Sequence, residues 1–390
     1  MSEKIHIAVD LGATSGRIML GGKNFPLVEV YRFETPMLHL PSGIHWDFES
    51  IFSHILTGLK QIDTKKYTVV SLSCDSWAQD FGLLDSAGNL TAPPFSYRDK
   101  GAAVSSIARL KYIEDKFPER LEKAETLLHI ADLVHYRLCG SRRSNHTLKA
   151  ISGLPEDHPL PAPEADCEII GRIHHPALPN LSGLPVISGA GHDTAAAYAG
   201  SGIKDGEILL SLGTWLMAAE PWDNAGELPE NFKRLPLIRK KFARTSGGMG
   251  LWPFQECVKL WKQRGCFPGY AILDQEAENS GITDWIDPDT PELFAPENME
   301  EAIFSLAGRK CSPPETTALL LRGTAWRIRQ TVAGFGHDFS RAVLVGGGSK
   351  CAYLCRLISE RLNCPLSVGA GEASAAGNIQ VQQEVMAFEG

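Results

Sequence analysis

Three short turns in this sequence combine glycines with neighbouring hydroxyl residues, and each follows a predicted strand. They occupy residues 10–17, 212–214 and 346–348. Glycine lets backbone N–H groups approach an anion closely, and the side chains of Thr14, Ser15 and Thr214 add hydroxyl donors. A single turn of this kind is more often a plain connection. Three of them at matching places predict a site for the phosphate groups of a nucleotide.

Two aspartates stand where they could assist phosphate chemistry. Asp10 ends a buried strand, and a carboxylate there suits a magnesium ion held through water. Asp193 lies in the segment Gly-His-Asp-Thr-Ala, where a strand meets a helix. It could simply cap that helix. The alternative is a general base that accepts a proton from a hydroxyl group as this group attacks the γ-phosphate, while the helix N-terminus attracts phosphate charge.

A third polar segment follows the end of another predicted strand. It contains Asp75, Trp77 and Asp80, with Ala78 and Gln79 between them. Two carboxylates and an aromatic face within six residues suit the hydroxyl groups of a polyol or a sugar. Ordinary turn and core residues are the competing interpretation of the same segment.

The elements that must position these residues follow an α/β order. Residues 5–9, 17–20 and 27–33 have the apolar pattern of strands. Asp47 then caps a helix with one apolar face, built by residues that recur at helical spacing. Residues 68–73 and 81–85 are predicted to be further strands. Strands, a crossover helix and more strands indicate an α/β domain.

The middle of the chain is less regular. Residues 107–117 and 121–138 are predicted to be helices, and a loop with four prolines spans residues 154–165. A strand at 185–188 then leads to the helix that begins at Asp193.

The opening pattern recurs after a junction at residues 201–206. A strand at 207–211, a tight Gly-Thr turn and a strand at 215–219 repeat the order seen at the N-terminus. Later elements are a helix at 316–335, a strand at 341–345, a helix at 352–362, a strand at 365–368 and a final helix opened by Glu372. Two similar domains, residues 1–200 and 201–390, are therefore predicted to face a shared ligand in a cleft.

Composition excludes several classes of protein. The apolar fraction of 43% and charged fraction of 22% are typical of a globular chain. A net charge of -8 argues against a nucleic-acid partner. No apolar run is long enough to span a membrane, and the N-terminus has no signal segment. Nine scattered cysteines without a CxxC pair indicate reduced thiols and a cytoplasmic protein.

Common nucleotide and metal motifs are missing. The sequence has no GxxxxGK[ST] motif, so a P-loop is excluded. Gly189 and Gly191 follow a strand as in a dinucleotide fingerprint, but Thr194 stands where the third glycine is needed. His174 and His175 have no third ligand at useful spacing.

Taken together, the segments resemble the FGGY carbohydrate kinases, and within them the branch that phosphorylates L-rhamnulose. The matching segments stand in family order: AVDLGATSGRIML, SCDSWAQDFGLLDSAGNL, YRD at 97–99, ADLVHYRLCG, GHDTAAA, LSLGTW, GGMGLWPFQ, LVGGGSK and GEASAAGNIQVQ. The resemblance implies two RNase H-like domains of the actin/hexokinase type with ATP between them. It also implies a kinase that uses Mg-ATP to phosphorylate a hydroxyl group of a small-molecule substrate, a ketose. The oligomeric state, monomer or dimer, stays open.

The resemblance assigns roles to individual residues. The catalytic base falls on Asp193, and the sugar would lie near Ala78 and the stretch from His192 onward. The ATP contacts would be Ala13, Thr14, Ser15, Gly16, Arg17, Gly213, Thr214, Gln255, Gly346, Gly347 and Gly348.

This chain departs from the branch in its sugar-binding half and at two positions of its nucleotide-binding half. Ala78 and Gln79 replace glycine and valine, and Gly247 and Cys351 each replace asparagine. A segment after Asp99 that lies near the substrate in relatives is largely absent, and their threonine-rich NATTTQL run is reduced to residues 146–150. These departures leave two alternatives open: a non-catalytic sugar or nucleotide sensor, and an ATPase that acts on a non-sugar partner.

Overall fold

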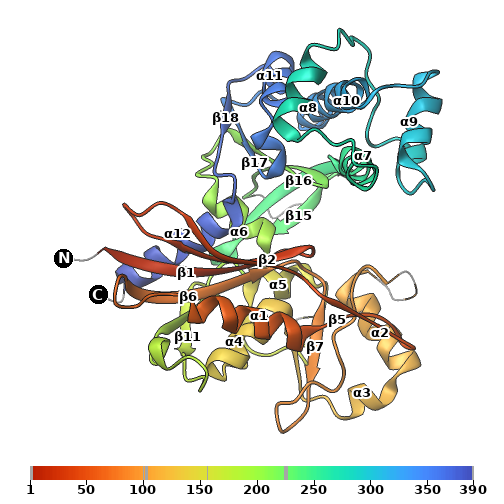
Figure 1. Cartoon of the computed structure of the whole chain (residues 1–390). Coiled ribbons are helices and arrows are strands. Elements are labelled where there is room, and N and C mark those ends of the chain that lie inside the picture. The colour runs from red at the N-terminus through yellow and green to blue at the C-terminus, as the bar shows by residue number, and fades with distance from the viewer. Residues whose placement is uncertain (1–2, 100, 102–103, 156, 224–226, 389–390) are drawn as a thin grey trace. The chain divides into compact units, whose positions relative to one another are not determined.

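The structure is a computed structural model that describes residues 3–99, 101, 104–155, 157–223 and 227–388. It divides into two compact units (Figure 1). Unit 1 comprises Met1–Gly200, Leu235–Phe242 and Ser374–Gly390, and unit 2 comprises Ser201–Arg234 and Ala243–Ala373. The first division falls at the junction after Gly200, whereas the final helix returns to unit 1 rather than to the C-terminal unit.

Unit 1 is built on a six-stranded sheet in the order β11-β12-β6-β1-β2-β3. The first three strands along the chain, β1, β2 and β3, pair antiparallel, and β6 and β12 add in parallel on the other side of β1. The strands are β1 (Lys4–Leu11), β2 (Ser15–Gly21), β3 (Val28–Glu34), β6 (Thr68–Ser76), β11 (Glu168–Arg172) and β12 (Pro185–Ser188).

Helices cover both faces of this sheet. Alternate residues of β1, including Ile7 and Val9, pack against α1 (Phe48–Lys60) and α4 (Ile130–Cys139). The opposite face, with Ala8 and Met19, packs against α12 (Ala373–Phe388). A strand whose side chains are buried on both sides is mostly apolar, which explains the run before Asp10, where the polar His6 is hydrogen-bonded to Ser71.

Smaller elements complete unit 1 (Figure 1). They are β4 (Met37–Leu40), β5 (Gly43–Trp46), β7 (Phe81–Leu84), α2 (Ser106–Lys116), α3 (Pro118–Glu122), β8 (Thr126–His129), β9 (Ser144–Asn145), α5 (His146–Ile151), β10 (Glu164–Ala165), α6 (Asp193–Gly200) and the short 3-10 helices Pro179–Leu181 and Ile238–Lys240.

Unit 2 repeats the sheet arrangement of unit 1. Its strand order is β15-β16-β14-β13-β17-β18, in which β13, β14 and β16 pair antiparallel and β17 and β18 add in parallel. The strands are β13 (Glu207–Leu212), β14 (Trp215–Pro221), β15 (Lys233–Pro236), β16 (Phe242–Met249), β17 (Arg341–Val345) and β18 (Leu366–Val368). The predicted α/β class and the two RNase H-like sheets are therefore confirmed.

The helices of unit 2 form two apolar clusters. Helices α10 (Pro313–Ala333) and α11 (Ala352–Arg361) pack against β13 and β17. A separate cluster joins α7 (Trp252–Gln263), α8 (Tyr270–Glu278), α9 (Met299–Ala307) and the second apolar face of α10. Among the described residues, no helix is both long enough and apolar enough to cross a membrane.

One predicted helix is wrong. Residues 121–138 do not form a continuous helix, because Thr126–His129 is the strand β8 and the helix begins only at Ile130. The apolar segment of β8 pairs antiparallel with β7 and is buried on both faces. Because its partner β7 lies far away in the sequence, the local apolar pattern does not reveal this pairing and indicates a helix instead.

Candidate active site

Three carboxylates gather at one edge of the unit 1 sheet. Asp10 and Asp75 lie opposite each other at the carboxyl ends of the parallel strands β1 and β6. The next residue of β6, Ser76, pairs with His192, and its N–H donates to the carbonyl of Gly191 at 2.9 Å. The loop before α6 is thereby held at the same edge, and it brings Asp193 to the other two aspartates.

The carboxylate of Asp10 is buried and has two polar partners. Its Oδ2 lies 3.0 Å from the guanidinium of Arg17, the residue opposite on β2, and accepts a hydrogen bond from the Ser374 hydroxyl at 3.0 Å. Burial raises the pKa of Asp10, whereas Arg17 lowers it and the charge of Asp193 raises it. Asp10 therefore lies in a buried, negative environment that the guanidinium groups of Arg17 and Arg32 offset only in part.

Asp75 is more poorly compensated. Its Oδ1 accepts a hydrogen bond from the Asn378 amide at 2.6 Å, but its Oδ2 is buried without a hydrogen-bond partner. Burial, followed by the nearby charge of Asp10, raises the pKa of Asp75 well above its usual range. The structure thus puts Asp75 beside the predicted magnesium ligand, although the sequence groups it with the sugar-binding residues.

Asp193 is the first residue of α6, and its side chain is 35% exposed. Its Oδ1 accepts a hydrogen bond from the Thr194 hydroxyl at 3.1 Å and lies 3.3 Å from Nε2 of His192. Within the described part of the chain, no backbone N–H donates to this carboxylate, so it does not cap the helix. Burial lowers the pKa of His192, which favours a neutral imidazole beside Asp193.

The turn that carries Ala13, Thr14 and Ser15 is rigid. The N–H of Gly12 donates to the carbonyl of Ser15 at 3.0 Å, and the N–H of Thr35 donates to the carbonyl of Thr14 at 3.1 Å. A side chain at Gly16 would lie 2.3 Å from the Phe33 ring and would displace it. The hydroxyl groups of the turn are therefore held on a fixed backbone.

Asp80 is buried inside unit 1 with both carboxylate oxygens engaged. Oδ2 accepts hydrogen bonds from the indole of Trp46 at 2.6 Å and from that of Trp77 at 2.9 Å, while Oδ1 pairs with Arg109, which is also fully buried. The N–H of Tyr97 donates to Oδ2 as well, at 3.2 Å. Because all these groups bind its carboxylate, Asp80 positions two indole rings and the loop at Tyr97. The sequence alone cannot distinguish this role from sugar binding.

Gln79 has a backbone φ of 75°, a conformation that L-residues rarely adopt. Its amide Nε2 donates to the carbonyl of Ile151 at 2.9 Å, and its Oε1 accepts from the N–H of Ser106 at 2.8 Å. Gln79 therefore ties the loop that contains the half-buried Ala78 to α5 and α2. Its amide is turned toward the protein.

The predicted nucleotide residues of unit 2 gather at the end of β13. The hydroxyl of Thr214 donates to Oε1 of Gln255 at 2.9 Å, and the N–H of Leu251 donates to the carbonyl of Gly213 at 2.8 Å. The turn after β17 lies against Leu212, because side chains at Gly346 and Gly348 would meet that residue at 2.7 Å and 2.5 Å. Gly347, between them, has open space around it.

Two departures from the family pattern have structural explanations. A side chain at Gly247 would lie 2.0 Å from the carbonyl of Leu216, so β14 and β16 approach too closely for any other residue. The Cys351 thiol donates to Asp274 at 2.9 Å at the start of α11, and burial raises its pKa. Its Sγ also accepts a hydrogen bond from the N–H of Leu354 at 3.4 Å, so Cys351 caps the helix.

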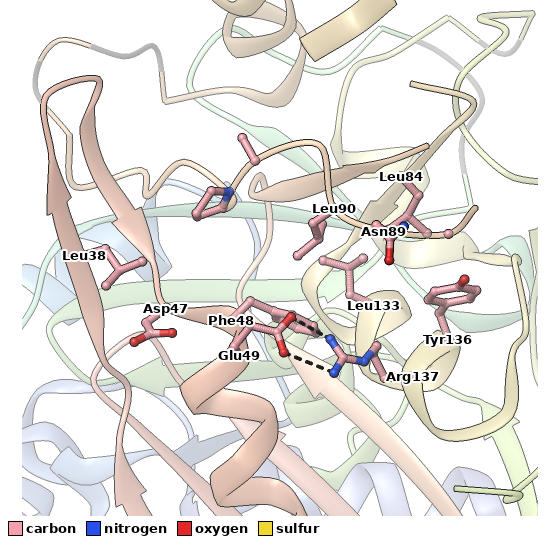
Figure 2. Close-up of a pocket in the computed structure, with 13 residues that line it drawn as sticks. Leu38, Asp47, Phe48, Glu49, Leu84, Asn89, Leu90, Leu133, Tyr136 and Arg137 are labelled. Atoms are coloured by element: carbon pink, nitrogen blue, oxygen red, sulfur yellow. Dashed lines mark hydrogen bonds and ion pairs between the residues drawn. The ribbon is translucent and has the colours of Figure 1, made fainter. Parts of the chain in front are cut away.

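A cavity of about 640 Å³ in unit 1 is not part of this site. Among the described residues that line it, none is a predicted site residue, and its walls come from β4, α1, α4 and the turn after β7 (Figure 2). Its cation, Arg137, is already paired with both oxygens of Glu49 at 2.7 Å and 3.1 Å (Figure 2). Asp47 accepts from the N–H of Ser50 as the cap of α1.

Sequence reasoning missed the contribution of α12. Ser374 contacts Asp10, Asn378 contacts Asp75, and Gln382 donates to Asn378 at 2.8 Å. Their spacing of four residues places them on one helix face. Polar residues at every fourth position of this final helix are the signal that could have identified them.

Comparison with known proteins agrees with this geometry. Residues 245–383 match the C-terminal domain of the FGGY family of carbohydrate kinases. Two rhamnulokinases are similar over nearly the whole chain. That of Pectobacterium atrosepticum is 28% identical, with 98% of this chain and 88% of the relative covered, and that of Oceanobacillus iheyensis is 26% identical, with 97% and 93% covered.

Solved structures show the same fold. Glycerol kinase from Plasmodium falciparum with ADP superimposes with a TM-score of 0.80 at 12% identity, covering 99% of this chain and 90% of that one. Ligand-bound xylulose kinase from Lactobacillus acidophilus gives 0.77 at 14% identity, with the same coverage. In sequence, residues 245–383 are similar to the C-terminal domain of the FGGY carbohydrate kinases, and nearly the whole chain is similar to the rhamnulokinases.

Proposed function

We propose that this chain transfers the γ-phosphoryl group of ATP to a hydroxyl group of a ketose, with Asp193 as the general base. The observation that carries the proposal is the state of the Asp193 carboxylate. It is partly exposed, receives no backbone N–H within the described residues, and lies close enough to Asp10 to raise the pKa of that group. A carboxylate with free acceptor capacity at a phosphate-binding edge can accept a hydroxyl proton.

Residues of unit 1 would hold the transferred group. The N–H groups of the turn around Ala13 and Gly16, with the hydroxyls of Thr14 and Ser15, would donate to phosphate oxygens. Arg17 would contribute positive charge, which stabilises charge that develops on the phosphoryl group.

Asp10 would hold a magnesium ion through water, and the ion would neutralise phosphate charge. The donor set fits an ion held in this way. In the part of the chain that the structure describes, no three acidic, histidine or cysteine side chains are close enough to bind an ion directly. The unpartnered Oδ2 of Asp75 adds a further acceptor beside Asp10 for a bound water.

The nucleotide would contact the residues at the end of β13 in unit 2. Gly213, Thr214 and the turn at residues 346–348 supply N–H groups and a hydroxyl, and Gln255 lies beside Thr214. Their mutual contacts within one unit support a single binding surface, which we assign to ATP.

The acceptor would be a ketose such as L-rhamnulose or a related sugar. Relatives that are named rhamnulokinase support this class. The sugar would lie near Ala78, Trp77 and His192. Because Gln79 replaces valine and pulls the loop toward α2 and α5, we expect a preference that differs from that of the relatives.

A coupled assay of ADP release over ketoses, deoxyketoses and polyols tests this function. One ketose should stimulate ATP turnover, and Asp193→Asn should lower kcat for it by about 10²- to 10⁴-fold with little change in ATP binding. The matched control is Asp85→Asn, which changes an exposed carboxylate in a turn and should retain full activity. Full activity of Asp193→Asn would show that another group is the base.

The alternative, a sensor that binds without catalysis, has its own signature. Titration calorimetry would then detect binding of ATP or sugar, while no acceptor in the panel stimulates ADP release. That result would reject the kinase proposal.

A further inference from the structure

Arg98 is a cation held against the turn that is predicted to bind phosphate. Its Nη2 donates to the hydroxyl oxygen of Thr14 at 3.1 Å. Its guanidinium also lies 5.8 Å from the centre of the Trp46 ring and 6.0 Å from that of Tyr97. Aromatic faces at such distances attract a guanidinium and limit its motion.

The backbone that carries Arg98 is fixed on both sides. The N–H of Tyr97 donates to the buried Asp80, and the N–H of Arg98 donates to the Ser96 hydroxyl at 3.2 Å. The N–H of Asp99 donates to the carbonyl of Ser96 at 3.0 Å, and its own carboxylate accepts from the N–H of Ile44. Arg98 is therefore presented by a rigid turn, as a group that acts on a reacting atom must be.

The charge of Arg98 is not neutralised by the protein. In the described structure no carboxylate forms an ion pair with it. The neighbouring arginines differ, since Arg17 pairs with Asp10 and Arg32 pairs with Glu29. An arginine has five N–H donors, and the described contacts of Arg98 use one of them.

The contact with Thr14 also orients that hydroxyl. Because Thr14 Oγ1 accepts a hydrogen bond from Arg98, its own proton remains available to donate. A phosphate oxygen placed beside Thr14 would then meet one hydroxyl proton and the remaining N–H groups of Arg98. Guanidinium groups bind phosphate through such paired donors.

We propose that Arg98 contacts the terminal phosphoryl group of the nucleotide, together with Thr14, and stabilises the charge that develops on it during transfer. This inference rests on the proposed kinase function. Arg98 supplies from within the same chain the kind of cation that stabilises phosphoryl transfer when it is aimed at the moving group.

The test compares Arg98→Gln and Arg98→Lys with the matched control Arg172→Gln. Arg172 is an exposed arginine of β11 whose guanidinium donates to the carbonyl of Gly183 at 3.0 Å. We expect Arg98→Gln to lower kcat by about 10²-fold, Arg98→Lys to restore part of that loss, and Arg172→Gln to change kcat by less than about 2-fold. Titration calorimetry should show weaker binding of ATP to Arg98→Gln and an unchanged affinity for ADP, which lacks the terminal group.

The outcomes separate the two proposals. If the unaltered protein has no sugar-dependent ADP release, the proposed function fails. If the unaltered protein is active and Arg98→Gln retains its kcat, the function stands and the role of Arg98 is refuted. An equal loss of affinity for ATP and ADP in Arg98→Gln would also refute a contact with the terminal phosphoryl group. Near-ultraviolet circular dichroism of the variant confirms that Trp46 and Tyr97 keep their environment.

Discussion

Replacing Asp132 by asparagine is expected to remove part of the pH dependence of folding. Asp132 is fully buried in α4, its Oδ1 accepts a hydrogen bond from the N–H of Asn145 at 3.1 Å, and its Oδ2 has no hydrogen-bond partner. Burial raises its pKa from 3.8 to about 8. The neighbouring His129, 3.9 Å away, has a pKa lowered to about 4 by burial, so it is neutral near pH 7 and offers no compensating charge.

The sign and size of the effect follow from proton linkage. Between the unfolded and folded pKa values of Asp132, the folded chain binds one more proton than the unfolded chain. Stability from this group is complete below the unfolded value and is lost as the pH rises toward about 8. Each pH unit in that window costs about 1.4 kcal/mol. From about pH 6 to about pH 8, Asp132 therefore lowers the free energy of unfolding by about 3 kcal/mol.

Urea unfolding at several pH values measures this contribution. Asp132→Asn keeps an oxygen for the Asn145 N–H but cannot ionise, so its stability should fall by about 3 kcal/mol less than that of the unaltered protein between about pH 6 and about pH 8. Asp85→Asn is the control, because hydrogen bonds from the Asn89 N–H lower the pKa of Asp85 and leave it ionised throughout this range. Parallel stability curves for Asp132→Asn and the unaltered protein would refute the reasoning.

Three further changes test individual contacts. Asp80→Asn leaves the buried guanidinium of Arg109 without its charge partner and should cost about 3–5 kcal/mol in urea unfolding; a loss below about 1 kcal/mol would show that the pair is not essential. Gly377→Ala would bring a methyl group to 1.8 Å from the Ala196 carbonyl, so we expect a loss of about 1–3 kcal/mol, which a lower melting temperature in calorimetry would reveal. Asp10→Asn should raise the magnesium concentration needed for half-maximal activity, and an unchanged magnesium titration would contradict the role of Asp10.

The strand ends were predictable because their cause is local. The run before Asp10 is apolar on both faces, and Asp47 caps α1 through the N–H of Ser50 as its position before an apolar helix indicates. Parallel pairing then brings the ends of β1 and β6 together. The end of each buried strand is where the chain can first present a polar side chain, so Asp10, Asp75 and Asp193 stand out in the sequence.

The different roles of the neighbouring aspartates Asp75 and Asp80 were not predictable from the sequence. Asp75 and Asp80 stand five positions apart in one segment, yet the first lies at the carboxylate edge and the second is enclosed by Trp46, Trp77 and Arg109. Two of these partners, Trp46 and Arg109, come from distant parts of the chain. Likewise, Asn378 contacts Asp75 across a separation of 303 residues, a relation that no local pattern encodes.

The carboxylate edge of unit 1 has an electrostatic consequence for ligand binding. Asp10 and Asp75 are both buried, the charge of Asp10 raises the pKa of Asp75, and the charge of Asp193 raises the pKa of both. Such a cluster opposes folding unless protons or cations neutralise it. Arg98 has the opposite charge: its exposed guanidinium has no carboxylate partner in the described structure.

A nucleotide with bound magnesium would match both the carboxylates and Arg98. The positive charge of the ion would face the carboxylates, and the phosphate oxygens of the nucleotide would face Arg98. A ligand that neutralises opposite charges in the folded state alone also stabilises that state. The carboxylates that oppose folding of the ligand-free protein would then stabilise the complex. Magnesium alone would neutralise only the carboxylates, and phosphate alone would neutralise only Arg98. The balance of charge at this edge therefore favours a ligand that combines the two over either one separately.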